Sequence, residues 1–533
     1  MYSEYLFDRQ DYLQLLEKRV EALKDGYRQN IAILGNENIG KTTIIHTFLS
    51  KFLDSRYVMV YLELRSESQE EFVRRFIAVF LYNFLTNSSE MLKEDLAFLI
   101  EKAKVYIPLT VSKIESLLQD IQRRKQDRII SRLFSLPSTL HQETGKFCVV
   151  LLDEFHLLET VGFKKLYTEW TQQLMSDRKT MYIIISSAIT KAERILNNQL
   201  SLLFGNFEVV RIEPFDIQTS ARFIDERCIQ RPLRNEERNF LIHFTGGWPF
   251  YLGMIADAYC ANKKLDLVTV LEQLLFNSSG ILFQRFLQNI SRFQQMRKGA
   301  EFLKVVSLVA VGHNRIKDIS HIIKKPIQKL NSTINFLLEE DILSRCGDFL
   351  KVADRVFGFW LRFVYQEKLS SLTFDAITQK VNFRKCLEQM ITEFNQESTL
   401  SINERMAQLL QLFMDERIQI ERTKVTLNHF WEIKPIEFNS KHLREGLICR
   451  SPESTWIIGF GSDILTDEDI QEFSQLCKRF RSKLVRKIII TAKGLDPNSR
   501  LKALDENIWT WGIEHLNEMC DLFSKPRIIQ TTE

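Results

Sequence analysis

The stretch "GNENIGKTT" at residues 35–43 most constrains what this chain can fold into. Gly35 and Gly40 bracket four residues, and Lys41 and Thr42 follow at once, which is the pattern of a phosphate-binding loop. The apolar run "NIAILG" precedes it and the helix-like "IIHTFLSKFL" follows. A strand, a glycine-rich turn and a helix in this order point backbone N–H groups and the positive end of the helix at a phosphate. The sequence therefore predicts a nucleotide site here.

Within this loop we expect Lys41 to bind the β- and γ-phosphates and the Thr42 hydroxyl to bind Mg²⁺. The alternative is a chance glycine-rich turn, and the position between a strand and a helix argues against it. The residues expected to contact the nucleotide are Gly35, Asn36, Glu37, Asn38, Ile39, Gly40, Lys41, Thr42 and Thr43.

Acidic residues end the apolar run "FCVVLLDEF" at 147–155. We expect Asp153 to hold Mg²⁺, partly through water, and Glu154 to act as the general base on the attacking water. The next apolar run ends in "IIISSA", where Ser186 or Ser187 is placed to bind that water or the γ-phosphate, with Ser187 assigned to the catalytic group. The alternative for both segments is an ordinary polar strand end.

Apolar runs at 57–64, 147–155, 181–188 and 207–215 alternate with helical patterns. This alternation predicts an α/β domain with a mostly parallel sheet. Roughly 80 residues between the second and third strands have a helical pattern and predict an inserted helical segment.

The rest of the chain divides by pattern. Residues 216–290 are helical with a break at "TGGWPF", and three helices and a short hairpin follow from residue 300. Residues 366–400 are polar and helical and suggest a linker. Strands return after residue 420, with a helix at 466–482, and predict a second α/β domain.

The bulk composition excludes several classes. The 533 residues include no run of ~18 apolar residues, so no membrane span is expected. The eight cysteines are scattered and the N-terminus carries charges where a signal peptide needs an apolar core, which predicts a reduced, cytoplasmic protein without a zinc site. The net charge of +4 neither requires nor excludes nucleic acid.

Six segments in order, "LFDRQDYLQLLEKRV", "IAILGNENIGKTTI", "VVLLDEFHLL", "IIISSA", "TGGWPFYL" and "VADRVFGFWLRFVY", resemble the archaeal-type ATPases of the STAND branch of the AAA+ superfamily. The resemblance covers roughly residues 5–366 and implies ATP and Mg²⁺ as cofactors. The expected domains are a P-loop ATPase core (1–215), a helical lid (216–290), a winged helix (291–365), a helical linker (366–400) and a C-terminal domain (401–533).

The resemblance also implies roles for further residues. Phe7 and Arg9 match an aromatic-x-Arg stretch near the adenine, with Asp8 where the family usually has glycine. Gly246, Gly247 and Pro249 match a lid segment near the nucleotide.

One departure concerns catalysis. Relatives often carry an arginine after the sensor strand, where this chain has Asn206. An arginine near the transferred phosphate is worth about 10³–10⁵ in rate, so fast hydrolysis is in doubt. Arg194 and Arg211 are nearby substitutes whose order the sequence leaves open.

The third helix of the expected winged helix, within residues 326–343, presents a polar face. In DNA readers this helix enters the major groove, whereas in STAND proteins it often serves packing and switching. The expected exposed residues are Lys324, Lys325, Gln328, Lys329 and Asn331.

Residues 401–533 resemble the restriction-endonuclease-like domain often fused to this ATPase family. Active members carry Glu-x-Lys on the strand that here reads "IIGFGSD", where Gly459 and Gly461 stand instead and Asp463 lies two residues beyond. Glu-x-Lys spacing recurs at Glu432 and Lys434, with Glu437 beyond, but on what we take to be the preceding strand. We therefore expect a catalytically degenerate domain.

The most basic stretch of this domain, residues 478–487, is either a helix face that meets phosphates or a solvated helix end. Its candidate contacts are Lys478, Arg479, Arg481 and Lys483.

These features together predict an ATP-dependent molecular switch that hydrolyses ATP slowly and couples its ATP or ADP state to a DNA or protein partner. One alternative is a nucleic-acid-binding scaffold with a structural nucleotide. Another is an ATP-dependent nuclease that uses residues 432–437. The sequence leaves open the biological process, the partner and the oligomeric state, although the absent arginine disfavours a ring.

Overall fold

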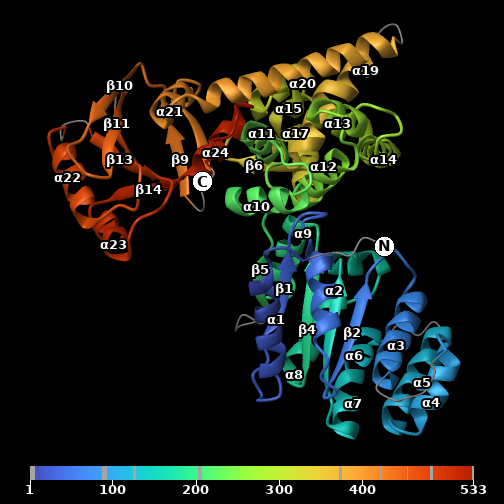
Figure 1. Ribbon diagram of the computed structural model, residues 1–533. Coiled ribbons are helices and arrows are strands. Elements are labelled where there is room, and N and C mark those ends of the chain that lie inside the picture. The colour runs from blue at the N-terminus through green and yellow to red at the C-terminus, as the bar shows by residue number, and fades with distance from the viewer. Residues whose placement is uncertain are drawn as a thin grey trace. The chain divides into compact units, whose positions relative to one another are not determined.

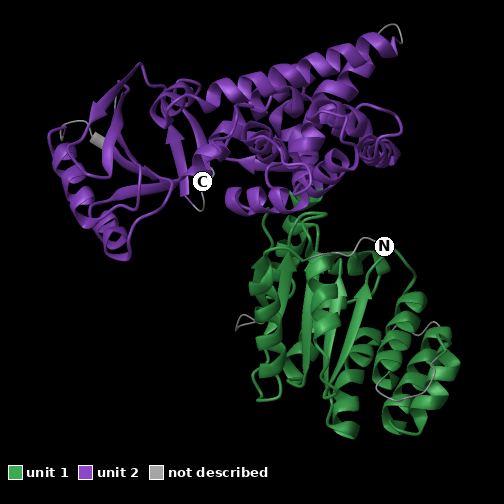
Figure 2. Ribbon diagram, in the orientation of Figure 1, with its two compact units in different colours: residues 1–214, 248–250, 339–341 green, residues 215–247, 251–338, 342–533 purple. Residues whose placement is uncertain are grey.

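The computed structural model describes residues 6–86, 93–123, 128–201, 207–370, 375–420, 423–452, 454–480 and 484–530. The chain forms two compact units (Figure 2). Unit 1 comprises residues 1–214 together with 248–250 and 339–341, and unit 2 comprises the rest. Two short pieces from far along the sequence therefore belong to the N-terminal unit.

Unit 1 is built on a five-stranded sheet in the order β2-β3-β4-β1-β5, and all its neighbouring strands are parallel. β1 and β4 are buried along their whole length, as expected for central strands of a parallel sheet. The predicted α/β fold with a parallel sheet is confirmed. The strands are β1 (Asn30–Leu34), β2 (Tyr57–Glu63), β3 (Phe147–Asp153), β4 (Thr180–Ser186) and β5 (Phe207–Arg211).

Helices connect these strands (Figure 1). The segment between β2 and β3 is helical, as predicted, and its helix α3 buries Phe72, Phe76 and Phe80 completely in the core of unit 1. The helices of unit 1 are α1 (Gln10–Ala22), α2 (Lys41–Lys51), α3 (Gln69–Leu85), α4 (Leu96–Lys104), α5 (Pro108–Gln122), α6 (Ile129–Phe134), α7 (Leu136–Thr144), α8 (Leu166–Ser176) and α9 (Ile189–Asn198).

Four strands, β2, β3, β4 and β5, end earlier than their apolar runs predicted. β3 stops at Asp153 because Glu154 adopts a left-handed conformation, with φ 53° and ψ 43°, which cannot continue a strand. The apolar Phe155 instead begins a short 3₁₀ segment that ends at Val161. Apolar composition alone therefore overestimates strand length where the chain turns toward a site.

Unit 2 begins with helices whose predicted break at "TGGWPF" is confirmed. α11 ends where Gly246 and Gly247 adopt φ 67° and 81°, and α12 begins at Pro249. These helices are α10 (Ile217–Arg227), α11 (Asn235–Thr245), α12 (Pro249–Ala261), α13 (Leu267–Leu275) and α14 (Ile281–Gln295).

Three further helices and an antiparallel hairpin follow in the predicted order. Helix α20 then buries Phe383, Leu387 and Phe394, so one face of the expected linker is packed. The elements are α15 (Gly299–Val311), α16 (Ile316–Ile323), α17 (Ile327–Glu339), β6 (Leu343–Cys346), β7 (Phe349–Val352), α18 (Arg355–Trp360), a π segment (Leu361–Tyr365), α19 (Gln366–Ser370) and α20 (Ala376–Ser398).

A second five-stranded sheet, in the order β10-β11-β12-β13-β14, lies in the C-terminal part of unit 2. β11 pairs antiparallel with both β10 and β12, whereas β13 pairs parallel with both β12 and β14. Its elements, with a separate hairpin β8–β9, are α21 (Ile402–Leu410), β8 (Glu416–Ile420), β9 (Thr423–Leu427), β10 (Glu432–Glu437), β11 (Leu443–Arg450), β12 (Thr455–Gly461), α22 (Asp467–Lys478), β13 (Leu484–Thr491), α23 (Pro497–Asp505), β14 (Ile508–Gly512) and α24 (Ile513–Leu522).

Two expectations for this region are wrong. Glu432, Lys434 and Glu437 lie on β10, which pairs with β11, so they are not on the strand directly before β12. The sequence interpretation missed β11 because its charged residues and glycine interrupt the apolar alternation.

The basic stretch at 478–487 is not one helix, because α22 ends at Lys478 and β13 begins at Leu484. Arg479 caps α22, and Arg481 and Lys483 lie outside the described residues.

The C-terminal helix is anchored by a buried carboxylate. Asp521 on α24 binds Arg355 of α18, and Arg527 donates to its two oxygens at 3.0 and 2.7 Å. Although burial opposes ionisation, the charges of Arg355 and Arg527 hold the pKa of Asp521 well below its usual range. This cluster joins elements more than 160 residues apart in the sequence.

Across the described ranges, the helices are too short or too polar to cross a membrane.

Replacing Asp521 by Asn should lower the free energy of unfolding by about 3 kcal/mol, because two arginines lose their shared buried partner. The ionised Asp521 stabilises the folded state because its pKa is lowered there. The free energy of unfolding of the wild type should therefore approach that of the variant as the pH falls below ~4. Urea unfolding at neutral and acid pH measures both effects. Glu518→Gln, exposed on the same helix, is the control, and equal unfolding of the two variants would contradict the assignment.

Candidate functional site

The loop between β1 and α2 has the predicted strand–loop–helix arrangement. Gly35 is buried, and a Cβ atom there would lie 2.9 Å from the carbonyl oxygen of Ile212, so a larger residue would force the backbones apart. Asn38 and Gly40, with φ 58° and 100°, turn the chain into α2. The loop backbone is thus fixed by close packing on one side and by left-handed residues on the other.

Lys41 lies inside this loop. Its ammonium group donates to the carbonyl oxygens of Gly35 and Asn36 at 2.7 and 2.8 Å, and the residue is 5% exposed. Burial lowers its pKa, while the nearby carboxylates of Glu154 and Asp153 oppose that shift. The cation therefore lies among the groups that the sequence predicts for phosphate binding.

The hydroxyl-bearing residues of the loop differ in exposure. Thr42 is exposed in the first turn of α2, whereas Thr43 is half-buried. The Thr42 side chain is thus accessible to a ligand at the end of the helix.

Asp153 lies at the end of β3 and is 3% exposed. The Tyr61 hydroxyl donates to its Oδ2 atom and the Glu154 N–H to its Oδ1 atom, both at 2.9 Å. Tyr61 comes from β2, the neighbour of β3 in the sheet. These two donors fix the carboxylate orientation at the carboxyl edge of the sheet.

Glu154 is held by the end of β4. Its Oε2 atom accepts from the N–H and hydroxyl of Ser187 at 2.9 and 2.8 Å, and His156 Nδ1 lies 3.3 Å away. Burial raises the pKa of Glu154, and the hydrogen bonds from Ser187 oppose the shift. Ser187 is thus the serine of this pair that contacts the predicted base.

Ser186 has a different set of partners. Its hydroxyl lies 2.8 Å from His156 Nδ1 and accepts from the Ala188 N–H at 3.1 Å. Burial lowers the pKa of His156 to about 4, so the imidazole is neutral at pH 7. Ser186 and His156 therefore fix the backbone where β4 leads into α9.

The N-terminal residues Phe7 and Arg9 are buried, at 8% and 7% exposure. Arg9 donates to the carbonyl oxygen of Glu213 at 2.7 Å, and its guanidinium lies 5.5 Å from the centre of the Tyr12 ring. Asp8 adopts φ 49°, in the left-handed region that favours glycine. This conformation agrees with the glycine that the family resemblance leads us to expect at this position.

Unit 1 also includes residues 248–250. The indole N–H of Trp248 donates to the carbonyl oxygen of Glu37 in the loop at 3.1 Å, and Pro249 follows as the first residue of α12. Gly247 belongs to unit 2, where a Cβ atom would lie 2.1 Å from the carbonyl oxygen of Phe215. The segment around Pro249 therefore reaches the loop through Trp248.

The candidate arginines are already paired with carboxylates. Arg194 lies 3.2 Å from Glu339 and 3.8 Å from Glu159, and Arg211 binds Glu193. Asn206 lies outside the described residues.

Sequence analysis missed Tyr61, His156 and Trp248. His156 and Trp248 lie within two residues of predicted positions, in "DEFH" and "GGWP", which is a usable signal. Tyr61 gave no signal, because its contact depends on the order of strands in the sheet.

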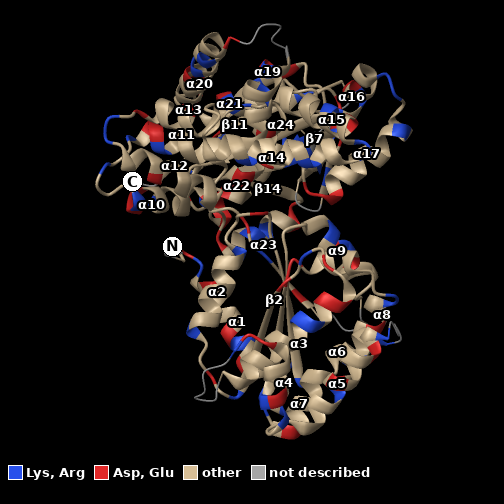
Figure 3. Ribbon diagram, turned by 90° about the vertical axis from the view of Figure 1, so that its right-hand side faces the viewer, with Lys and Arg blue, Asp and Glu red and all other residues tan. Residues whose placement is uncertain are grey.

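The predicted polar face of α17 and its preceding turn is exposed. Lys325 lies 2.7 Å from Glu301, and Figure 3 shows the charged residues of this region. The exposed residues are Lys324, Lys325, Gln328, Lys329 and Asn331.

Gly459 and Gly461 lie against apolar side chains. A Cβ atom at Gly459 would meet Leu443 and Phe473 at 3.1 Å, and one at Gly461 would meet Leu465 at 3.0 Å. The space beside β12 is therefore hydrophobic.

The nearby acids are engaged elsewhere. Asp463 lies 3.3 Å from Lys493, and Glu432 lies 2.6 Å from Arg450. In the described parts of the chain, no cluster of three or more His, Cys, Asp or Glu side chains could hold a metal ion.

Comparison with known proteins agrees with this geometry. Residues 6–255 match a family described as an ATPase domain predominantly from Archaea. This part of the chain is similar to archaeal-type ATPase domains. The chain is 22% identical over 253 residues to an uncharacterized ATP-binding protein of Methanocaldococcus jannaschii, a match that covers 45% of this chain and 66% of that protein.

A solved structure supports the fold of this ATPase domain. The Walker-type ATPase of Pyrococcus abyssi matches with a TM-score of 0.50 and 18% identity, over 67% of this chain and 97% of that one. At this identity the likeness shows the fold alone.

Lys41→Ala should abolish ATP binding by the ATPase domain, because it removes the cation that lies inside the phosphate loop. Calorimetry of the full chain measures the affinity. Lys51→Ala, exposed at the other end of α2, should leave it unchanged. Equal ATP affinity of Lys41→Ala and wild type would contradict the assignment of residues 35–43 as a phosphate-binding loop.

Proposed function

We propose that this chain is an ATP-binding molecular switch of the STAND branch of the AAA+ ATPases that hydrolyses ATP slowly and couples its nucleotide state to a DNA or protein partner. One observation carries the proposal. The carboxylate of Glu154 is bound by Ser187, which lies between β4 and α9, and Thr190 in the first turn of α9 is bound by Asp341 from the turn between α17 and β6.

ATP binding rests on the loop and its neighbours. We infer that the loop N–H groups and Lys41 bind the phosphates. The family resemblance implies that Phe7 and Arg9 lie near the adenine and that Pro249 lies near the nucleotide. The hydroxyl of Thr42 and the carboxylate of Asp153 are oxygen donors of the kind that Mg²⁺ prefers, so these residues fit the metal. Bound Mg²⁺ would neutralise charge on the phosphates.

Hydrolysis rests on Glu154 as the general base. Its raised pKa brings the carboxyl group closer to the range in which it accepts a proton from water at neutral pH. Ser187 fixes the orientation of this carboxylate. Arg194 and Arg211 are each bound to glutamates, and we infer that turnover is slow because neither is free to neutralise a transferred phosphate.

The N-terminus of α9 would couple the nucleotide site to the β6–β7 hairpin. Its cap residue, Ala188, offers no side-chain hydrogen bond, and the Asp341 carboxylate takes that role. The Thr190 hydroxyl donates to Asp341 Oδ1 at 2.6 Å and the Thr190 N–H lies 3.2 Å from Oδ2. A displacement of Glu154 and Ser187 therefore acts on the turn that leads into the β6–β7 hairpin.

The elements after the helices α10–α14 would bind the partner. We infer that α15–α17 and β6–β7 form the winged helix, with the exposed basic face of α17 available for phosphate contacts. We infer that residues 401–533 are a degenerate restriction-endonuclease-like domain, because the surroundings of Gly459 and Gly461 are apolar. Lys478 and Arg479 are its candidate phosphate contacts.

The two alternative functions, a nucleic-acid-binding scaffold and an ATP-dependent nuclease, require different chemistry. A scaffold with a structural nucleotide would bind ATP without turnover. A nuclease would need metal-dependent chemistry from Glu432, whose carboxylate is bound by Arg450 on the neighbouring strand.

Glu154→Gln should keep ATP and Mg²⁺ bound but lower turnover by about 10²-fold, because an amide cannot accept the proton. Phosphate release and calorimetry on the full chain separate the two effects. Glu63→Gln, exposed on β2 opposite Asp153, is the control. If Glu154→Gln turns over ATP as fast as the wild type, Glu154 is not the general base. If the wild type and all variants bind ATP without turnover, the scaffold is favoured.

Asp341→Asn should lower kcat about fivefold with little change in KM, because it weakens the cap that orients α9 and Ser187 by about 1 kcal/mol. Steady-state kinetics measure the split. Glu340→Gln changes the exposed neighbour and should match wild type. If Asp341→Asn and Glu340→Gln turn over ATP equally, the coupling path is not through Asp341.

A further inference from the structure

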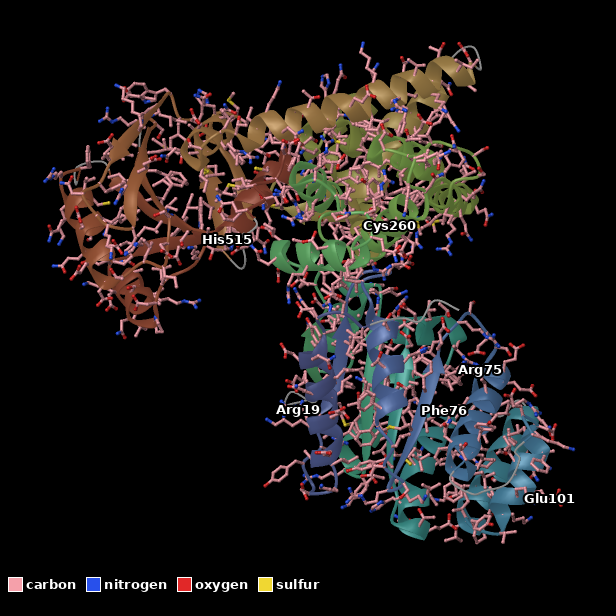
Figure 4. All side chains as sticks on the ribbon, viewed as in Figure 1. Arg19, Arg75, Phe76, Glu101, Cys260 and His515 are labelled. Carbon is pink, nitrogen blue, oxygen red and sulfur yellow. The ribbon has the colours of Figure 1, made fainter. Side chains whose placement is uncertain are left out.

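A pair of thiols lies between two helices that follow the ATPase sheet. Cys228 caps the end of α10, and Cys260 lies in the last turn of α12 (Figure 4). Their Sγ atoms are 3.3 Å apart, although the residues are separated by 32 positions in the sequence. A disulfide bond is about 2.05 Å long, so the sulfurs need to approach by only about 1.3 Å.

The backbone around the pair is held in register by arginines. Arg227 lies 2.6 Å from Asp257, which ties the residue before Cys228 to α12. Arg231 lies 3.7 Å from the centre of the Tyr259 ring and donates to the Tyr259 carbonyl at 2.7 Å. These contacts do not involve the sulfurs, so they keep the thiols adjacent before and after a reaction.

We propose that Cys228 and Cys260 form a redox-responsive modification site, which a peroxide oxidises to a disulfide that joins α10 to α12. The proposal does not depend on ATP turnover.

The two sulfurs have different roles in this reaction. Cys260 is half-buried and meets the peroxide first, whereas Cys228 is buried and burial raises its pKa to about 12. The Cys260 thiolate attacks one peroxide oxygen, which breaks the O–O bond, gives a sulfenic acid and releases hydroxide that is protonated to water. Cys228 then attacks the Cys260 sulfur, loses its thiol proton, and expels the sulfenic oxygen as a second water. The two thiols together lose two electrons, which reduce the peroxide.

A disulfide between Cys228 and Cys260 would close a ring around the segment between them. Residues 228–260 contain α11, the glycines that end it, and Trp248 and Pro249 beside the phosphate loop. A disulfide would restrict the conformations of this segment in the unfolded chain and raise its resistance to unfolding.

The test uses the full chain treated with hydrogen peroxide, then alkylated, digested without reductant and analysed by mass spectrometry. We expect a linked peptide that contains Cys228 and Cys260, its loss on reduction with dithiothreitol, and a higher melting temperature of the oxidised protein. Cys386→Ser removes another half-buried thiol and should behave as wild type.

Single serine variants separate the two roles. Cys228→Ser should leave Cys260 as a sulfenic acid that dimedone traps, and Cys260→Ser should leave Cys228 reduced. Because serine is close in size to cysteine, melting of the untreated variants reports whether they fold. The proposal would be overturned if the folded wild type yields no linked peptide, or if its Cys386 thiol is oxidised as readily as the thiols of Cys228 and Cys260.

Discussion

The parallel pairing of β1, β4 and β3 is the constraint on which the ATPase site depends. Parallel strands end at the same edge of a sheet, so this order brings three loops together. The register pairs Leu34 with Ser186, and the Gly35 N–H donates to the Ser186 carbonyl at 3.2 Å. The phosphate loop, the acidic pair and the serines are therefore neighbours through backbone geometry before any side chain contributes.

The buried charges at this edge stabilise one another. Burial lowers the pKa of Lys41 and raises that of Glu154, and the attraction between their opposite charges opposes both shifts. Each individual hydrogen bond there is worth about 1 kcal/mol, so a γ-phosphate and its metal ion can outweigh them. In the proposed switch, ATP binding would use this balance to rearrange Glu154 and Ser187.

The sequence predicted the parallel sheet, the phosphate loop and the acidic pair, because local pattern determines each of them. Tyr61 was not predictable, since its contact with Asp153 depends on which strand lies beside β3. The end of β3 was misplaced because the left-handed Glu154 follows an apolar run that continues into Phe155.

In the C-terminal sheet, β11 and β14 escaped detection because neither shows a simple alternation of apolar and polar residues. The contact of Asp341 with α9 joins residues 151 positions apart, and no local pattern reports such a contact. Local sequence thus predicted the strand–loop–helix arrangement and the acidic end of β3 better than the contacts between distant segments.

Backbone hydrogen–deuterium exchange of the full chain, with and without ATP and Mg²⁺, tests the central claim most directly. We expect altered exchange in the phosphate loop at residues 36–43 and also at 188–192 and 339–343, because hydrogen bonds of Gly35 with Ser186 and of Thr190 with Asp341 join these segments through the backbone at 186–190. A change confined to residues 36–43 would show that ATP binds without acting on α9 and Asp341, and would contradict the switch.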